Sequence, residues 1–241
     1  MAGTRLATSP FLSADDLCAL EQIMSPPRSF RSGVDLIREG DRPDELLIMA
    51  RGWACRSTAT RKGDRQSPAV LVPGDIGNLD TLLLERLDYD VRTLTESTIT
   101  AMPRDRVLAL CAERPGLARS FTWLALIENV ALSKWTLSLG RRPARERVAH
   151  LLCELSARMG REVEDRSSFP YPLTQYHVAD ALGLTPVHVN RMMQQLRAEG
   201  AIRTASRTMT VPCVARLREI AGFDPRYLHL DAPAAVQAAQ A

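Results

Sequence analysis

Two kinds of hydrophobic spacing alternate along the chain. Ser13 precedes two aspartates and a short apolar face that stops at Pro26, which predicts a short helix capped by Ser13. Between residues 28 and 102, short apolar runs alternate with turns marked by glycines at positions 40, 52, 63 and 74. This rhythm predicts short strands joined by hairpins, and hence a small β-sandwich or roll.

Helical spacing returns at residues 103–113 and then over a long segment, roughly 117–139. Between residues 120 and 139 the only charged side chains are Glu128 and Lys134, too few for a helix with a single buried stripe. One apolar side of this helix can cover the roll. The other side needs a separate partner, and we expect that partner to be a second copy of the chain. A helix buried entirely within one chain is the alternative. The predicted dimer interface comprises Trp123, Ile127, Val130, Lys134 and Leu137.

Residues 141–143 interrupt this pattern and are interpreted as a hinge. Apolar residues at helical spacing then predict a helix over residues 144–159, which Gly160 ends. The polar stretch 161–172 contains two prolines and is interpreted as a loop.

The segment 173–211 predicts two short helices followed by a hairpin. Thr174 and Thr185 are expected N-cap residues, Gly183 permits a tight turn between the helices, and Pro186 suits the first position of the second helix. Residues 202–211 alternate around a turn and predict a β-wing. The whole segment therefore predicts a winged helix-turn-helix. The expected buried face of its second helix comprises Val189, Met192, Met193 and Leu196.

A winged helix-turn-helix places its second helix, here residues 186–199, in the major groove of DNA. Arginine can bind guanine and asparagine can bind adenine through two hydrogen bonds, and an apolar side chain can contact a thymine methyl. The start of the first helix and the wing are expected to hold phosphates. A purely structural helical pair is the alternative. The candidate DNA-binding residues are Thr174, Gln175, Thr185, Val187, His188, Asn190, Arg191, Gln194, Arg203 and Arg207.

The formal net charge of +3 is unevenly distributed. Residues 1–139 hold 17 basic and 18 acidic residues, a net of −1, whereas residues 140–222 hold 13 and 8, a net of +5. Residues 223–241 hold one arginine and two aspartates, a net of −1. A basic excess in the segment with the helix-turn-helix favours a polyanionic partner. An uneven surface without a partner is the alternative.

The five cysteines are widely spaced, at positions 18, 55, 111, 153 and 213. Their odd number and spacing fit reduced thiols in the cytoplasm rather than a disulfide framework. The N-terminal residues have no apolar run typical of a signal peptide. Because Glu128 and Lys134 interrupt the most apolar stretch, we expect no membrane span and a cytoplasmic protein.

The order of the roll, the long helix, RRPARERVAHLL and LTQYHVADALGLTPVHVNRMMQQLRAEGAI resembles the Crp/Fnr family of bacterial transcription regulators. The resemblance extends over residues 10–222 and includes LVPGDIGNLD at residues 71–80. It implies a homodimer that binds a near-palindromic site on double-stranded DNA, with RNA polymerase as a further partner.

The resemblance also implies an α+β fold whose double-stranded β-roll is of the cyclic-nucleotide-binding type. The expected domains are the roll over residues 1–114, a dimerisation helix and hinge over 115–140, the winged helix-turn-helix over 141–222 and a tail over 223–241.

An effector pocket in the roll is a further implication of the resemblance. Family members that bind cyclic nucleotides carry Gly-Glu and Arg-Ser or Arg-Thr, where this chain has Gly77-Asn78 and, near the second position, Tyr89-Asp90. Asparagine lacks the carboxylate acceptor, and an aspartate would repel a phosphate. We therefore expect an effector other than cyclic AMP, or none, and an atypical cyclic-nucleotide cassette is the alternative. The candidate pocket residues are Gly74, Gly77, Asn78, Leu79, Tyr89, Arg92 and Thr93.

The residues favour no other cofactor and no enzymatic activity. Oxygen-sensing members carry a cluster of cysteines near the N-terminus for an iron–sulfur centre, where this chain has only Cys18. All four histidines lie beyond residue 139, so no roll histidine is available as a haem ligand, and Cys55 or the amino terminus is the alternative ligand. The same absence disfavours a cupin-like metalloenzyme, the alternative from another class. We predict no catalytic and no metal-ligating residues.

The recognition helix matches the family only in part. Arg191 stands where family members carry the arginine that reads guanine, which implies the same role here. Better-known members carry Glu at the position of Val187 and often Ser or Gly at that of Asn190. We therefore expect a half-site that differs at the base pairs read by that Glu.

Overall fold

The computed structural model describes residues 3–159, 162–163 and 165–230. These residues form two compact units, the first containing mainly residues up to 58 and 69–130, and the second residues 59–68 and 131–228.

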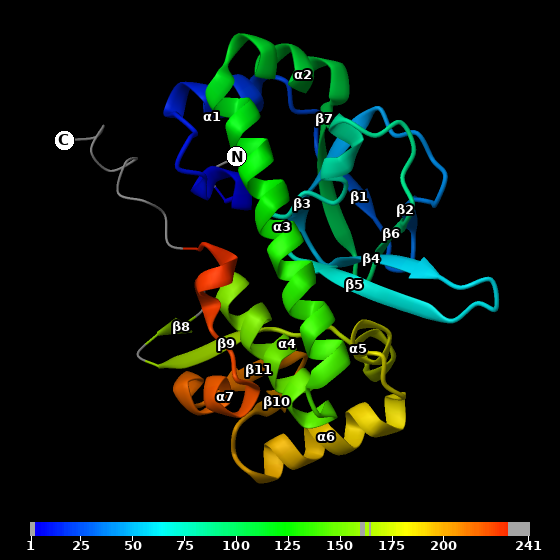
Figure 1. Ribbon diagram of the computed structural model, residues 1–241, viewed down its shortest axis with the longest axis vertical. Coiled ribbons are helices and arrows are strands. Elements are labelled where there is room, and N and C mark those ends of the chain that lie inside the picture. The colour runs from blue at the N-terminus through cyan, green and yellow to red at the C-terminus, as the bar shows by residue number, and fades with distance from the viewer. Residues whose placement is uncertain (1–2, 160–161, 164, 231–241) are drawn as a thin grey trace. The chain divides into compact units, whose positions relative to one another are not determined.

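The first unit is built around two antiparallel sheets, which confirms the predicted roll. One sheet has the order β1-β7-β3, and the other has the order β2-β6-β4-β5 (Figure 1). The glycines at positions 40, 52, 63 and 74 all have positive φ, as their turns require. The strands of these sheets are β1 (Arg28–Phe30), β2 (Asp35–Ile37), β3 (Glu45–Arg51), β4 (Ala54–Ala59), β5 (Arg65–Leu71), β6 (Asp90–Thr93) and β7 (Ser97–Pro103), and residues 65–68 of β5 fall in the second unit.

Helices cover one side of this core. The side chain of Ser13 accepts a hydrogen bond from the Asp16 amide, and the Asp16 side chain accepts one from the Ser13 amide, so α1 begins with a complete capping box. The apolar core of the roll includes Leu46 and Ile48 of β3 and Phe121 and Leu124 of the long helix. The helical elements are η1 (Arg5–Thr8), α1 (Ala14–Gln22), η2 (Leu79–Leu82), α2 (Arg104–Glu113) and α3 (Pro115–Arg141), of which residues 131–141 belong to the second unit.

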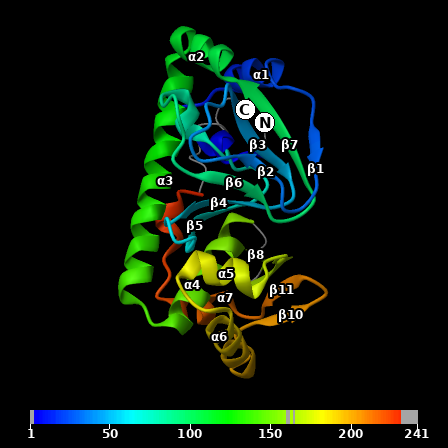
Figure 2. The same cartoon turned by 90° about the vertical axis from the view of Figure 1, so that its right-hand side faces the viewer.

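The second unit contains the predicted helix-turn-helix and a four-stranded sheet with the order β10-β11-β9-β8. Figure 2 shows the hairpin of β10 and β11 projecting from this unit, which also carries α6. Its elements are α4 (Ala144–Arg158), β8 (Glu162–Val163), β9 (Arg166–Pro170), α5 (Gln175–Leu182), α6 (Pro186–Ala198), β10 (Arg203–Ala205), β11 (Thr208–Val211), α7 (Val214–Ala221) and η3 (Pro225–Leu228).

The prediction of a loop over residues 161–172 is wrong, because this stretch contains β8 and β9. Strand β9 pairs with β11, with Phe169 opposite Met209, and its side chains alternate between exposed and buried. The buried Ser167 and Phe169 complete the sheet, a pairing with a distant strand that local polarity does not reveal. Gly160, expected to end the preceding helix, lies outside the described residues.

The start of the expected tail belongs to the second unit. Phe223, Tyr227 and Leu228 are buried, and η3 packs against α4. The packed structure of this unit therefore continues beyond residue 222.

Candidate functional site

The helix-turn-helix is positioned by local interactions that the sequence encodes. Thr174 caps α5 by accepting a hydrogen bond from the His177 amide, and Thr185 caps α6 by accepting one from the His188 amide. Gly183 ends α5 in the left-handed conformation with φ of 60°. Pro186 occupies the first turn of α6, where a missing N–H carries no cost. The hydroxyls of both predicted DNA-contact threonines therefore hold the helices in place.

The predicted recognition helix presents a polar face around one exposed apolar side chain. Val187 in its first turn is 80% exposed, and Arg191 and Gln194 are exposed farther along the helix. His188 and Asn190 are partly buried between them. The opposite face is buried in the unit, as predicted, and comprises Val189, Met192, Met193 and Leu196. Such a face combines donors for base edges with an apolar group for a thymine methyl.

The wing carries two exposed arginines beside this helix. Arg203 lies on β10, and Arg207 lies in the tight turn before β11. Ser206 and Arg207 have φ of 47° and 59°, the conformation of a two-residue hairpin turn. Arg197 near the end of α6 donates a hydrogen bond from Nε to Thr204 Oγ1 at 3.0 Å. This contact holds the wing beside the recognition helix.

Tyr176, next to Gln175 at the start of α5, is a large exposed side chain that was not among the predicted DNA-binding residues. The sequence could have indicated this exposed position, because Tyr176 directly follows Gln175, the first residue of the helix that Thr174 caps. A second missed contact joins α4 to α6, where Arg145 donates from Nε to Glu199 Oε1 at 3.1 Å within an ion pair. The hydrogen bonds from Arg145 lower the pKa of Glu199.

Asn78, the residue in place of the expected glutamate of a cyclic-nucleotide cassette, is fully buried. Its Oδ1 accepts a hydrogen bond from the Leu47 amide at 2.7 Å. Its Nδ2 donates to the Glu45 carbonyl and to Thr81 Oγ1, both at 2.8 Å. The side chain is thus engaged in joining η2 to β3 and is not free to face a ligand.

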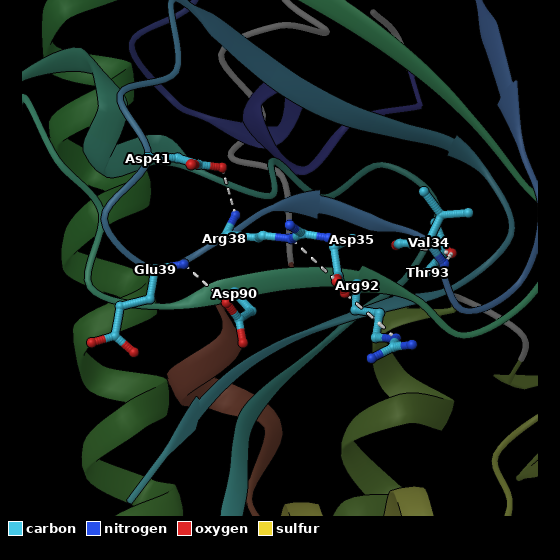
Figure 3. Close-up of polar contacts among 8 residues, drawn as sticks. All are labelled: Val34, Asp35, Arg38, Glu39, Asp41, Asp90, Arg92 and Thr93. Carbon is cyan, nitrogen blue, oxygen red and sulfur yellow. Dashed lines mark hydrogen bonds and ion pairs between the residues drawn. The ribbon is translucent and has the colours of Figure 1, made fainter. Parts of the chain in front are cut away.

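Other pocket candidates also have structural partners (Figure 3). Thr93 is buried, where its Oγ1 donates to the Arg31 carbonyl and accepts from the Val34 amide. The Arg92 guanidinium lies 3.5 Å from Asp35 Oδ1 in an ion pair. Leu79 belongs to the apolar core of the roll, and the Gly74 amide donates to the Met49 carbonyl.

Gly77 and Tyr89 lie together, joined by a residue that the sequence analysis missed. Arg56 of β4 donates from Nε to the Gly77 carbonyl at 2.8 Å and from Nη2 to the Ile76 carbonyl at 3.1 Å. Its guanidinium carbon lies 5.4 Å from the centroid of the Tyr89 ring. Its Nη1 donates to Glu128 Oε2 of α3 at 2.9 Å.

The buried positive charge of Arg56 is balanced by the carboxylate of Glu128. Burial lowers the pKa of Arg56, but Glu128 and neighbouring groups more than reverse this effect, so the pKa is raised. Burial also raises the pKa of Tyr89, and Arg56 opposes the rise. An arginine that contacts two backbone carbonyls and a carboxylate therefore stays charged between the roll and α3.

The predicted dimer stripe runs along the boundary between the buried and exposed sides of α3. Trp123 packs against the core of the first unit, and Ile127 is 3% exposed. The side chain of Ile127 is already buried within the chain, which leaves little of its surface for contact with a second copy. The exposed apolar side chains at helical spacing are Leu126, Val130 and Leu137, and Lys134 is exposed on the flank.

Among the described residues, no group of three or more His, Cys, Asp and Glu side chains is placed to hold a metal ion. In the same part of the chain, no helix is both long and apolar enough to cross a membrane.

The roll, the long helix and the winged helix-turn-helix define a class of DNA-binding transcription regulators. Residues 27–114 match the family of cyclic nucleotide-binding domains, and residues 146–220 match that of Crp-like helix-turn-helix domains. The chain is 31% identical over 217 residues to the transcriptional activator protein FnrL of Cereibacter sphaeroides, covering 88% of this chain and 86% of that protein. The chain therefore belongs to the Crp/Fnr family of transcription regulators.

A further relative agrees with this assignment, and a solved structure shares the fold. A probable transcriptional activator of Rhizobium leguminosarum is 37% identical over 177 residues, covering 73% of this chain and 72% of that protein. The structure of FixK2 from Bradyrhizobium japonicum shares the fold, with a TM-score of 0.75 and 22% identity over 83% of this chain and 98% of that chain.

Proposed function

We propose that the protein acts as a homodimer that binds a near-palindromic DNA site, with α6 of each copy in the major groove. The observation that carries the proposal is the exposed face of α6, where Val187, Arg191 and Gln194 project from a rigidly capped helix. The net charge of +5 on residues 140–222 supports a polyanionic partner. The exposed Leu126, Val130 and Leu137 of α3 support pairing with a second copy.

In this proposal the side chains divide into base-reading and phosphate-binding groups. Arg191 binds guanine, Asn190 binds adenine, and Val187 contacts a thymine methyl. His188 and Gln194 also face the base edges. Phosphates are held by Gln175, by the helix starts at Thr174 and Thr185, and by Arg203 and Arg207 of the wing. RNA polymerase is the proposed further partner, the bacterial cytoplasm the proposed compartment, and regulation rather than catalysis the proposed role.

We also propose that the roll does not respond to cyclic AMP. The burial of Asn78 and Thr93 and the contacts of Arg56 with Gly77 and Glu128 support this part of the proposal. A ligand would have to displace a charged guanidinium from two carbonyls and a carboxylate, which costs more than filling an open pocket.

Selection of bound duplexes from a random pool tests the DNA proposal. The selected duplexes should contain inverted half-sites. Arg191→Ala should cost about 1–3 kcal/mol at one base pair of each half-site and relax specificity there. Arg203→Ala should instead weaken binding to all sequences and reduce the salt slope by about 1.

Arg216→Ala, a change at an exposed arginine of α7, serves as the control and should leave the specificity unaltered. Equal binding of the unaltered protein to random and selected duplexes would overturn the proposal.

A further inference from the structure

A buried carboxylate joins three elements of the second unit. Glu154 of α4 is 2% exposed. Its Oε2 accepts hydrogen bonds from Trp135 Nε1 of α3 and from the Tyr227 hydroxyl of η3, both at 2.8 Å. Its Oε1 accepts from Arg158 Nη1 at 3.3 Å. A single carboxyl group is thus shared by donors from the end of the long helix, from α4 and from the C-terminal segment.

Aromatic packing encloses this carboxylate. His150, one turn before Glu154 on α4, stacks on Tyr227 with ring centroids 6.2 Å apart and an interplanar angle of 14°. Phe223 contacts both rings edge to face. In such surroundings the hydrogen bonds to a carboxylate are strong, and losing one leaves a buried charge with too few donors.

The same helix is connected to the DNA-reading face. Arg145, two turns before Glu154 on α4, pairs with Glu199 at the end of α6. Helix α4 also packs directly on α6. Helix α4 therefore bears polar contacts at both places, with the end of α3 at Glu154 and with α6 at Arg145.

We propose that Glu154 is a positioning residue for DNA recognition: by holding Trp135 and Tyr227 it sets the angle between the last turns of α3 and helix α6. The inference rests on the proposed function, in which α3 carries the dimer contact and α6 enters the major groove. Two recognition helices fit one face of DNA only when they stand about 34 Å apart. Residues that fix the angle between α3 and α6 therefore determine which half-site spacing the dimer accepts.

The test compares duplexes that contain the same two selected half-sites at spacings lengthened or shortened by single base pairs. Trp135→Phe and Tyr227→Phe each remove one donor to Glu154 and keep an aromatic ring, and Glu154→Gln removes the charge. We expect the preference for the best spacing over its neighbours to fall about tenfold in each variant. Affinity for a duplex with one half-site should change by less than about twofold, because α6 itself is unaltered.

Tyr171→Phe is the matched control, because Tyr171 is a buried tyrosine of the same unit that contacts Phe169 instead of this cluster. It should retain the unaltered spacing profile. A variant that merely loosens the unit would also weaken binding to the duplex with one half-site, and that result would overturn the inference. An unchanged spacing preference in all three variants would overturn it as well. If the unaltered protein prefers no pair of half-sites, the proposed function fails instead.

Discussion

Arg56 of β4 and Glu128 of α3 form an ion pair with Nη1 and Oε2 2.9 Å apart, in which the side chains are only 11% and 21% exposed. The pair links a strand of the roll to the helix that carries the proposed dimer contact. The two residues are 72 positions apart in the chain. The ion pair therefore joins two parts of the first unit that lie far apart in the sequence.

Removal of the Glu128 charge should destabilise the first unit. Glu128→Gln leaves the Arg56 guanidinium buried without its counter-charge, which we expect to lower the free energy of unfolding by about 2–4 kcal/mol. The double variant Arg56→Met and Glu128→Met should recover most of the loss, because no unpaired charge remains. Urea unfolding measures both effects, with Glu113→Gln at an exposed site of α2 as the control. Equal losses in Glu128→Gln and the double variant would contradict this account.

Cyclic nucleotides should not stabilise the protein. Because the Arg56 guanidinium engages Gly77, Ile76 and Glu128, cyclic AMP and cyclic GMP should leave the melting temperature and the DNA affinity unchanged. Differential scanning fluorimetry and calorimetric titration provide the measurements. Binding of either nucleotide at micromolar concentration would show that the cluster opens to admit a ligand.

Asn78 should be important for stability rather than for ligand response. Asn78→Ala leaves the Leu47 amide and the Glu45 carbonyl without this partner, which we expect to cost about 2–4 kcal/mol of unfolding free energy. Asn78→Asp retains an acceptor for Leu47 and loses the donor to Glu45, so both variants should be less stable than the unaltered chain. A loss below about 0.5 kcal/mol in Asn78→Ala, measured by urea unfolding, would be inconsistent with this role.

The stability of the second unit should fall in mild acid because of His150. The pKa of His150 is lowered to about 4, chiefly by burial; Glu154 opposes this shift, and Arg142 and Lys134 add to it. Its ordinary value is 6.5, so between these values the unfolded chain binds a proton that the folded chain excludes. The free energy of unfolding should therefore decrease as the pH falls below 6.5, by up to about 1.4 kcal/mol per pH unit.

The check is a series of urea unfolding curves between about pH 7 and pH 5. His150→Gln removes the titrating group and should flatten this part of the pH dependence. If His150→Gln is as pH-sensitive as the unaltered chain, a group other than His150 causes the pH dependence of unfolding.

Much of the fold was predictable because its signals are local. The caps at Ser13, Thr174 and Thr185 and the turn at Gly183 depend on neighbouring residues, so each could be recognised from a few positions. The alternation of the roll and the apolar face of α6 follow from strand and helix periods. These features sufficed to predict a roll and a winged helix-turn-helix.

The sequence by itself determined which elements form and which face of α6 is buried, because backbone geometry and short-range hydrogen bonds decide both. Only the tertiary structure decided that Ile127 is buried within the chain, that Asn78 is fully engaged and that β9 completes the wing sheet. It also brought Arg56 to Glu128 and Trp135 to Glu154. Each of these facts depends on which distant segment packs against a residue, because residue type and local spacing alone do not determine long-range packing.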